Sequence, residues 1–501
     1  MELNLSHDAI KINESFYDGA LEQSIEYEYQ LPDYYPGIFK LLQCRIEPHI
    51  CSCRTSTDQL VIDGDAVMKL MYIDEDGGSI SSIEQNIPFS KTLDLKDEPN
   101  NPAIFCSAKT NYANCRIVSP RKIELRGALT IFLKVQAQKE EAILNDASGA
   151  GIEINRNPIL VTAKQIWTTR QFSISEQIDL DPPAEEILDV RVKAIAEDCK
   201  IIANKAITKG TAYICILYRT EGRKKPVTKK ITMPISQIID MPGIDEEFEC
   251  DVRYDVTSVD NTTSQDGASL NIDADIVVNC CGMLSCNIDA ITDAYSTECE
   301  IKTTTKEFNS PTMLSLIDDN LTLSEKLEVP NMEDIYDIYS NFFDVTSEKT
   351  HDGLHFNARL NIVILGSNKD EETVIFEKSI PVEFDITKNL NCDNPNVDAD
   401  IIITNNEAEL INGESQIKID LHIGGHVSCN KKFLTVSDLV LDETKPKTKS
   451  NSALTLYYPE FGDSVWNIAK QFCTSPNAIM EANNLESNIV KDKIMLIIPI
   501  V

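Results

Sequence analysis

The stretch SLNIDADIVVNC (residues 269–280) alternates apolar and polar side chains along most of its length. A period of two is that of a β-strand, in which successive side chains point to opposite faces of a sheet. The stretch therefore predicts a strand with one face on a hydrophobic core and the other in water. Two further segments carry the same pattern, KIELRGALTIFL (122–133) and QIKIDLHIGGHV (416–427).

These three segments belong to copies of one larger repeat. Leu125, Ile272 and Ile419 hold the same place in them and lie 147 residues apart. Two upstream sets of anchor residues recur at 146 or 147 residues: Ala66, Ala212 and Ala358, and Pro88, Pro234 and Pro381. Each copy is much longer than the ~20–50 residues of a solenoid unit. We therefore expect three tandem copies of one domain, arranged as separate units rather than as a stacked array.

Each copy has short alternating segments divided by turn residues, a pattern typical of an antiparallel sandwich or barrel. The expected fold class is mainly β, with three tandem antiparallel β-sandwich or barrel-like repeats and a small α+β domain. The expected repeat limits are 1–145, 170–300 and 320–441. The three anchor prolines are expected near strand starts or on edge strands, where a missing N–H costs little.

The end of the chain follows a different pattern. Residues 442–453 (DETKPKTKSNSA) are polar and predict an exposed linker that isolates the C-terminal segment from the repeats. Residues 454–501 then predict the order strand, helix, helix, strand, with Asp463 or Ser464 as the N-cap of the first helix and Thr474-Ser475 as the cap of the second. Trp466 is expected in the core of this small domain, because so small a domain needs its large apolar side chains to form a core.

This last segment resembles a LysM domain. The family pattern has a Gly-Asp-Ser/Thr-Leu-Trp start, an Ile-Ala pair, an Asn-Asn-Leu after the second helix and a terminal Ile-Pro. The matching residues are Gly462, Asp463, Ser464, Val465, Trp466, Ile468, Ala469, Asn483, Asn484, Leu485, Ile498 and Pro499. The chain departs from the pattern at Phe461, where proline is usual, and at 491–493, where Lys-Asp-Lys replaces Pro-Gly-Gln.

The LysM resemblance implies a binding groove between the loop after the first strand and the loop after the second helix. The implied groove residues, for glycan or protein, are Gly462, Asp463, Ser464, Val465, Asn483, Leu485 and Ile489. The alternative is that Val465, Leu485 and Ile489 are core residues, because so small a domain needs most of its apolar side chains.

Three β-rich repeats followed by one LysM domain resemble the SPOCS-domain spore coat assembly proteins of the SipL type. The resemblance implies a non-enzymatic scaffold in spore coat morphogenesis, cytoplasmic in the mother cell and located at the forespore surface. It implies as partners a morphogenetic ATPase of the SpoIVA type and other coat proteins, contacted through the LysM domain. The alternative is a protein that binds peptidoglycan or cortex glycan through the LysM groove.

The composition narrows the class of partner. The chain has 80 acidic against 46 basic residues, a formal net charge of −34. Such a field repels nucleic acid and anionic lipid, so neither nucleic-acid binding nor membrane insertion is expected. The start MELN has no basic region followed by an apolar segment, which predicts a protein made and kept in the cytosol.

The sequence gives little indication of an enzymatic activity. It contains no G-x-S-x-G, Walker A, H-E-x-x-H or G-x-G-x-x-G motif. His422, Asp420 and His426 could converge on a metal from one face of a strand, but Gly424-Gly425 interrupts that strand. We therefore expect no catalytic residues, no metal and no cofactor. The 15 cysteines lack metal-ligand spacing and are expected to be reduced and mostly buried.

Overall fold

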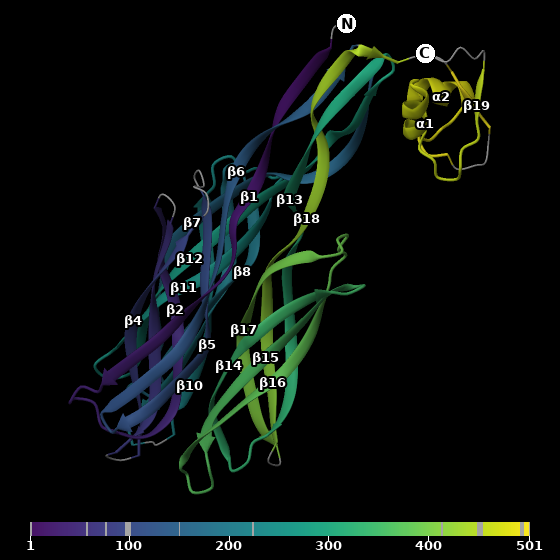
Figure 1. Ribbon diagram of the computed structural model, residues 1–501. Helices are drawn as coiled ribbons and strands as arrows, with labels where there is room; N and C mark the ends of the chain where they lie inside the picture. The colour runs from purple at the N-terminus through teal and green to yellow at the C-terminus, as the bar shows by residue number, and fades with distance from the viewer. Residues whose placement is uncertain are drawn as a thin grey trace.

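The computed structural model describes residues 3–56, 59–75, 78–95, 102–149, 151–222, 225–411, 414–447, 454–490 and 495–499. Long antiparallel strands make up most of it, and two short helices lie near the C-terminus (Figure 1). The predicted fold class, mainly β with a small α+β domain at the end, is confirmed.

The first unit is a sandwich of two three-stranded sheets. Its strands are β1 (Asn4–Gln30), β2 (Ile38–Ser56), β3 (Gln59–Asp74), β4 (Ile80–Asp94), β5 (Ala103–Ser119) and β6 (Lys122–Ser148). One sheet has the order β1-β6-β5 and the other β2-β3-β4, and all neighbours are antiparallel. Leu60 and Ile62 of β3 and Leu129 and Ile131 of β6 are fully buried between the sheets.

The second and third units repeat this topology. The second contains β7 (Ile152–Asp179), β8 (Ala184–Ile202), β9 (Lys205–Thr220), β10 (Val227–Asp240), β11 (Glu249–Thr263) and β12 (Ser269–Ser296). The third contains β13 (Cys299–Glu328), β14 (Asp334–Lys349), β15 (Gly353–Ser367), β16 (Thr373–Thr387), β17 (Pro395–Ile411) and β18 (Glu414–Pro446). Their sheets have the orders β7-β12-β11 and β8-β9-β10, and β13-β18-β17 and β14-β15-β16.

The alternating segments at 122–133, 269–280 and 416–427 lie in β6, β12 and β18, the central strand of one sheet in each unit. Pro88, Pro234 and Pro381 lie in β4, β10 and β16, which are outer strands as expected. The domain limits given from the sequence stay predictions. Of the proposed linker, residues 442–446 form the end of β18, whereas 448–453 lie outside the described residues.

Each unit extends into a two-stranded arm. Strand β5 pairs with β6 only as far as Gln136, and beyond that point β1 and β6 pair with each other alone. Strands β7 and β12, and β13 and β18, overrun their third strand in the same way. Figure 1 shows the three arms converging at the end of the molecule where the N-terminus lies.

The arms hold one another through equivalent apolar residues. Leu144, Ile291 and Val436 are buried in one cluster at the arm tips, and in each unit this residue directly precedes a β-bulge. A second cluster contains Met71, Leu217 and Leu365, one residue from the central strand β3, β9 or β15 of each unit. Equivalent residues meeting in shared clusters place the three units around a pseudo-threefold axis.

Charged residues fill the space between these apolar clusters. Arg45 of the first unit pairs with Asp189 of the second, and Arg191 of the second pairs with Asp337 of the third at 2.7 Å. All four side chains are less than a tenth exposed. Burial works against ionisation of Asp189, but Arg45 and Arg191 outweigh it and lower the pKa of its carboxyl to about 2.

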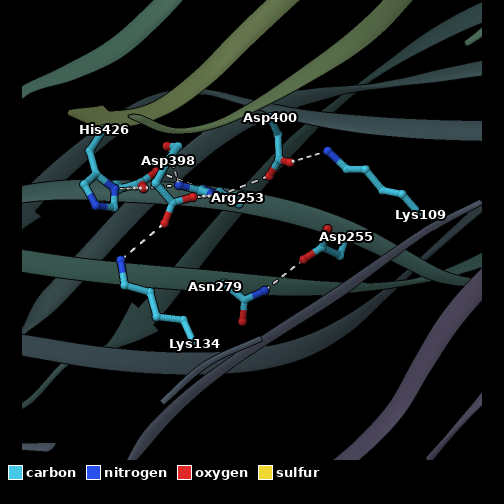
Figure 2. A network of polar contacts seen from close by, with 9 residues as sticks. Lys109, Lys134, Arg253, Asp255, Asn279, Asp398, Asp400 and His426 are labelled. Atoms are coloured by element: carbon cyan, nitrogen blue, oxygen red, sulfur yellow. Dashed lines mark hydrogen bonds and ion pairs between the residues drawn. The ribbon is translucent and has the colours of Figure 1, made fainter. Parts of the chain in front are cut away.

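A second charged junction joins the units nearer the arms (Figure 2). Arg253 of β11 donates to Asp398 of β17 at 2.7 Å and also pairs with Asp251 at 2.8 Å, which in turn contacts His426 of β18 at 2.7 Å. From the first unit, Lys134 lies 3.6 Å from Asp398, and Lys109 reaches the adjacent Asp400 at 3.3 Å. The expectation of separate units was therefore wrong, because the outward-facing residues of each sandwich are matched to the other two.

Removing the charge of Asp189 is expected to destabilise the whole assembly. The Asp189→Asn variant leaves Arg45 and Arg191 buried without their shared carboxylate, which costs about 3–5 kcal/mol of the free energy of unfolding. Urea denaturation of the full chain measures this. The matched control is Asp240→Asn, whose side chain is 76% exposed beside Lys205 and whose loss changes stability by less than about 1 kcal/mol. Equal effects of the two variants would show that the buried chain of charges does not hold the units.

The second junction predicts a loss of stability in acid. Burial works against ionisation of Asp251, but Arg253 and His426 outweigh it and keep the pKa of the carboxyl below its ordinary value of 3.8. The stabilisation from a lowered pKa is complete above the ordinary value and is lost as pH falls through the folded-state value. Below pH 4 the free energy of unfolding should therefore fall less steeply in Asp251→Asn than in the wild type. The exposed Asp273→Asn should follow the wild-type curve, and an unchanged slope in Asp251→Asn would contradict this assignment.

Candidate binding site of the C-terminal domain

The C-terminal domain has the predicted order of elements. Strand β19 (Thr455–Tyr457) pairs antiparallel with β20 (Leu496–Ile498), and helices α1 (Val465–Phe472) and α2 (Pro476–Asn483) lie between them in the chain. The residues that follow the helices, Cys473 after α1 and Asn484 after α2, are both in the left-handed conformation that closes a helix. Ser464 and Ser475 occupy the N-cap positions, and Pro476 begins α2, where its missing N–H costs nothing.

Hydrogen bonds join the two loops that the LysM resemblance singles out. The backbone N–H of Val465 donates to the carbonyl of Asn488 at 2.8 Å, and that of Gly462 donates to Val490 at 2.9 Å. In return, the N–H of Val490 donates to Asp463 at 2.9 Å. The loops after β19 and after α2 therefore form one continuous surface. Gly462 has φ of +91°, a left-handed backbone that other residues adopt with strain.

The implied groove residues divide into two groups. Val465 is completely buried in the domain core, and the side-chain amide of Asn483 is used by Ile479 and by the backbone of Ile497. Leu485 packs partly against the same core. Gly462 is exposed, and Ile489 is 54% exposed. Asp463 and Ser464 are half-buried between these two groups.

Phe461 belongs beside the exposed members of this set. Its side chain is 76% exposed directly before Gly462, at the position where the family has proline. Sequence reasoning noted this departure but did not include Phe461 among the site residues. A large apolar side chain in place of a usual proline was the signal that could have identified it. Gly462 and Ile489, the exposed members of the predicted site, and the neighbouring Phe461 are together called the groove rim.

The domain is fastened to the arm of the second unit on another face. Trp466 of α1 donates from Nε1 to the carboxylate of Asp293 at 2.9 Å, and Lys470 pairs with the same carboxylate at 2.6 Å. The Tyr295 hydroxyl donates to the carbonyl of Thr474 at 2.6 Å. The rings of Tyr295 and Trp466 meet edge to face with centroids 4.9 Å apart.

Electrostatics support this attachment. Burial works against ionisation of Asp293, but the hydrogen bonds from Lys470 and Trp466 outweigh it and keep the pKa of its carboxyl below the ordinary value. Trp466 is buried as expected, but Tyr295 of the second unit shares its cluster. The expectation that the domain is isolated from the repeats was therefore wrong, since a tryptophan in a small domain can be covered by a neighbour as well as by its own core.

The histidines considered for a metal point to different partners. His426 contacts Asp251 of the second unit at 2.7 Å, whereas His422 contacts Asn320 of β13 at 3.3 Å. Asp420 accepts hydrogen bonds from Thr322 and Asn405 instead. Within the described ranges, no three His, Cys, Asp or Glu side chains are grouped so as to hold a metal ion.

Comparison with protein families identifies the two kinds of domain. The model described as the SipL SPOCS domain matches residues 37–130 and 183–263, and the model of the LysM domain matches 460–491. The chain carries SipL SPOCS domains and a LysM domain. The SPOCS matches begin one residue before β2 and one residue before β8, so they start at the same place in the first two units. No curated protein and no solved structure matches the chain.

These matches support a spore-associated protein with a LysM binding module. The SPOCS and LysM domains are of a binding type rather than a catalytic one, and a LysM domain indicates binding of peptidoglycan or a related glycan. Among the described residues, no helix is long and apolar enough to span a membrane.

Breaking the attachment should free the LysM domain without unfolding it. In Asp293→Ala the charged and hydrogen-bonded partner of Lys470 and Trp466 is lost, while the eight buried residues that the domain itself contributes to its core cluster are unchanged. We expect the transverse ¹⁵N relaxation rates of residues 455–490 to fall toward those of a small, independently tumbling domain. The control is Asp289→Ala, an exposed carboxylate on the same strand β12. Relaxation rates that stay at the whole-chain value in Asp293→Ala would contradict the proposed attachment.

Proposed function

We propose that this protein is a non-enzymatic scaffold of spore coat assembly, in which the SPOCS units position a LysM domain that docks onto a partner. The observation that carries the proposal is the attachment of α1 to the second unit through Trp466, Lys470 and Asp293. A tethered catalytic domain needs freedom to reach its substrate, whereas a docking module benefits from a fixed orientation, because less entropy is lost on binding.

The attachment leaves the groove rim on the solvent side. Phe461 and Ile489 remain 76% and 54% exposed, and Gly462 between them in the chain is also exposed. Aromatic and aliphatic side chains exposed beside a surface of backbone groups are suited to anchoring a protein partner. The three interlocked units supply a large support, joined by the buried chain from Arg45 to Asp337.

The partner that we propose is a coat protein at the forespore surface, with a morphogenetic ATPase of the SpoIVA type as the first candidate. The location is the mother-cell cytoplasm, where the coat is assembled on the forespore. The net charge of −34 favours a basic face on the partner and disfavours nucleic acid and anionic lipid. The limits of the three SPOCS repeats, proposed at 1–145, 170–300 and 320–441, belong to the same hypothesis.

Glycan binding is the second candidate function. It is favoured by the LysM match over 460–491, which contains both groove loops, and by the exposed ring of Phe461, against which a sugar face can pack. Under this alternative, the groove rim contacts peptidoglycan or cortex glycan rather than a protein.

A double substitution of the groove rim tests the proposal. Phe461→Asp with Ile489→Asp should weaken binding of the full chain to the purified ATPase at least about tenfold, since truncating apolar anchors in an interface typically costs more than 1 kcal/mol. The control is Phe39→Asp, which alters an equally exposed phenylalanine on β2. Isothermal titration with the ATPase and sedimentation with purified peptidoglycan give the two readouts.

The outcomes separate the two candidates. Loss of ATPase binding in the rim variant, with no wild-type binding to peptidoglycan, supports protein docking. Rim-dependent binding to peptidoglycan with no affinity for the ATPase replaces protein docking by glycan binding. Unchanged binding of the ATPase by the rim variant would move the docking surface away from the LysM groove.

A further inference from the structure

The two sheets of the first unit meet along a seam between edge strands. Strand β2 is the outer strand of one sheet and β5 is the outer strand of the other, and they belong to different sheets. They lie side by side, as the hydroxyl of Thr110 on β5 donates to the carbonyl of Ile46 on β2 at 2.7 Å. No backbone ladder joins the described residues of these two strands, so side chains connect them.

Two pairs of thiols face each other across this seam. The side chains of Cys44 on β2 and Cys115 on β5 are within hydrogen-bonding contact, and so are those of Cys53 on β2 and Cys106 on β5. All four cysteines are half-buried and pack against the core of the unit. The contact from Thr110 to Ile46 lies between the two pairs along both strands.

The spacing of the cysteines fits two simultaneous pairs. Cys44 and Cys53 are nine residues apart, and so are Cys106 and Cys115, as antiparallel neighbours require. An odd spacing normally places two side chains on opposite faces of a strand. Here β2 has a bulge at Ile50/Ser52 and β5 has one at Thr110/Tyr112, and each bulge shifts the alternation by one residue. Both thiols of each strand therefore face the same side.

The other two units have related features. In the second unit Cys199 of β8 lies 146 residues after Cys53, follows an equivalent bulge, and is hydrogen-bonded to Cys250 of β11. In the third unit Cys392 and Cys429 form a disulfide with Cα atoms 6.2 Å apart. The prediction that the cysteines are all reduced is wrong for this pair, which sequence spacing did not identify because its members are 37 residues apart.

We propose that the seam of the first unit is a thiol–disulfide exchange site, at which a small-molecule disulfide oxidises Cys44 with Cys115 and Cys53 with Cys106. Each resulting disulfide joins β2 to β5 and links the two sheets covalently along this edge. The alternative is that the four cysteines only fill space as small apolar side chains, as buried cysteines often do.

The exchange proceeds through two displacements at each pair. The thiolate of Cys53 attacks one sulfur of the small disulfide, forms a mixed disulfide and releases one small thiolate. The thiolate of Cys106 then attacks Cys53 Sγ, forms the protein disulfide and releases the second small thiolate. Two protein thiols are oxidised and one small disulfide is reduced, and the two thiol protons pass to the released thiolates. Cys115 and Cys44 react in the same order.

Contact within each pair acts oppositely on its two thiols. Contact with Cys106 lowers the pKa of Cys53, and contact with Cys44 lowers the pKa of Cys115. The same contacts, together with burial, raise the pKa of Cys106 and Cys44. In the proposed exchange Cys53 and Cys115 therefore attack first, and the same two links form if their partners attack instead.

Closing both pairs should make the first unit harder to open. Each disulfide encloses β3 and β4 in its loop, and a cross-link over a long loop removes conformational freedom from the unfolded chain. Two neighbouring edge strands that share no backbone hydrogen bonds are also the place where a sandwich separates first. Disulfides at both ends of the seam remove this opening.

The test treats the reduced full-length protein with oxidised glutathione and maps the products by mass spectrometry without reduction. We expect linked peptides that join Cys44 to Cys115 and Cys53 to Cys106, while the exposed Cys51 stays available to alkylation or carries glutathione. Amide hydrogen exchange in β2 and β5 should slow by at least about tenfold in the oxidised protein.

Two variants complete the test. Cys53→Ser should lose its own link, keep the Cys44–Cys115 link and lose part of the protection, whereas Cys51→Ser should keep both links and all of the protection. The wild-type mapping does not depend on either variant folding. Glutathione adducts on all four cysteines without intramolecular links would overturn the proposal. The expected links with unchanged hydrogen exchange would also overturn it, because the seam would then not limit opening.

Discussion

The buried chain Arg45–Asp189–Arg191–Asp337 passes through all three units, and the position of each sandwich depends on it. Four charges are removed from water there, at a desolvation cost that only close and alternating pairing can offset. Any rotation of one unit against the others would leave an arginine or an aspartate buried without its partner. The four buried charges therefore chiefly determine how the three sandwiches are oriented, because any other orientation would leave a buried charge unpaired.

The chain of charges repeats one pairing between neighbouring units. Arg45 and Arg191 occupy the same place on β2 and β8, opposite Lys69 and Cys215 of the central strands. Asp189 and Asp337 occupy another shared place, opposite Leu217 and Leu365. Each arginine thus meets the aspartate of the next unit. The series ends in the third unit, where Tyr339 stands in the place of the arginine and its ring lies against both Arg45 and Arg191.

The sequence predicted what depends on local pattern. Alternation in 269–280 and its two copies identified the central strands, and the spacing of the LysM motif identified two helices and two strands. It did not predict how the units pack, because the partners of Asp293 or Arg253 lie more than 140 residues away and local periodicity carries no information on them. In the candidate site, Gly462 and Ile489 were placed at the surface by the structure, and Val465 and Asn483 were found to serve the domain itself. Phe461 was noted as a departure from the family pattern but was not included in the predicted groove, because only positions that match the pattern were carried over.

The pairing of the first and last strand in each unit has a consequence for how such a chain can change in length. Strands β1 and β6 bring the entry and exit of the first unit to one arm tip, and β7 leaves from that same tip to begin the next unit. A whole unit can thus be duplicated or deleted in a gene without altering the pairing inside any other. The shared clusters at the axis oppose this freedom, since three arms already enclose the core of Leu144, Ile291 and Val436. Three units complete the arrangement around the pseudo-threefold axis, and a fourth unit would have to lie outside it.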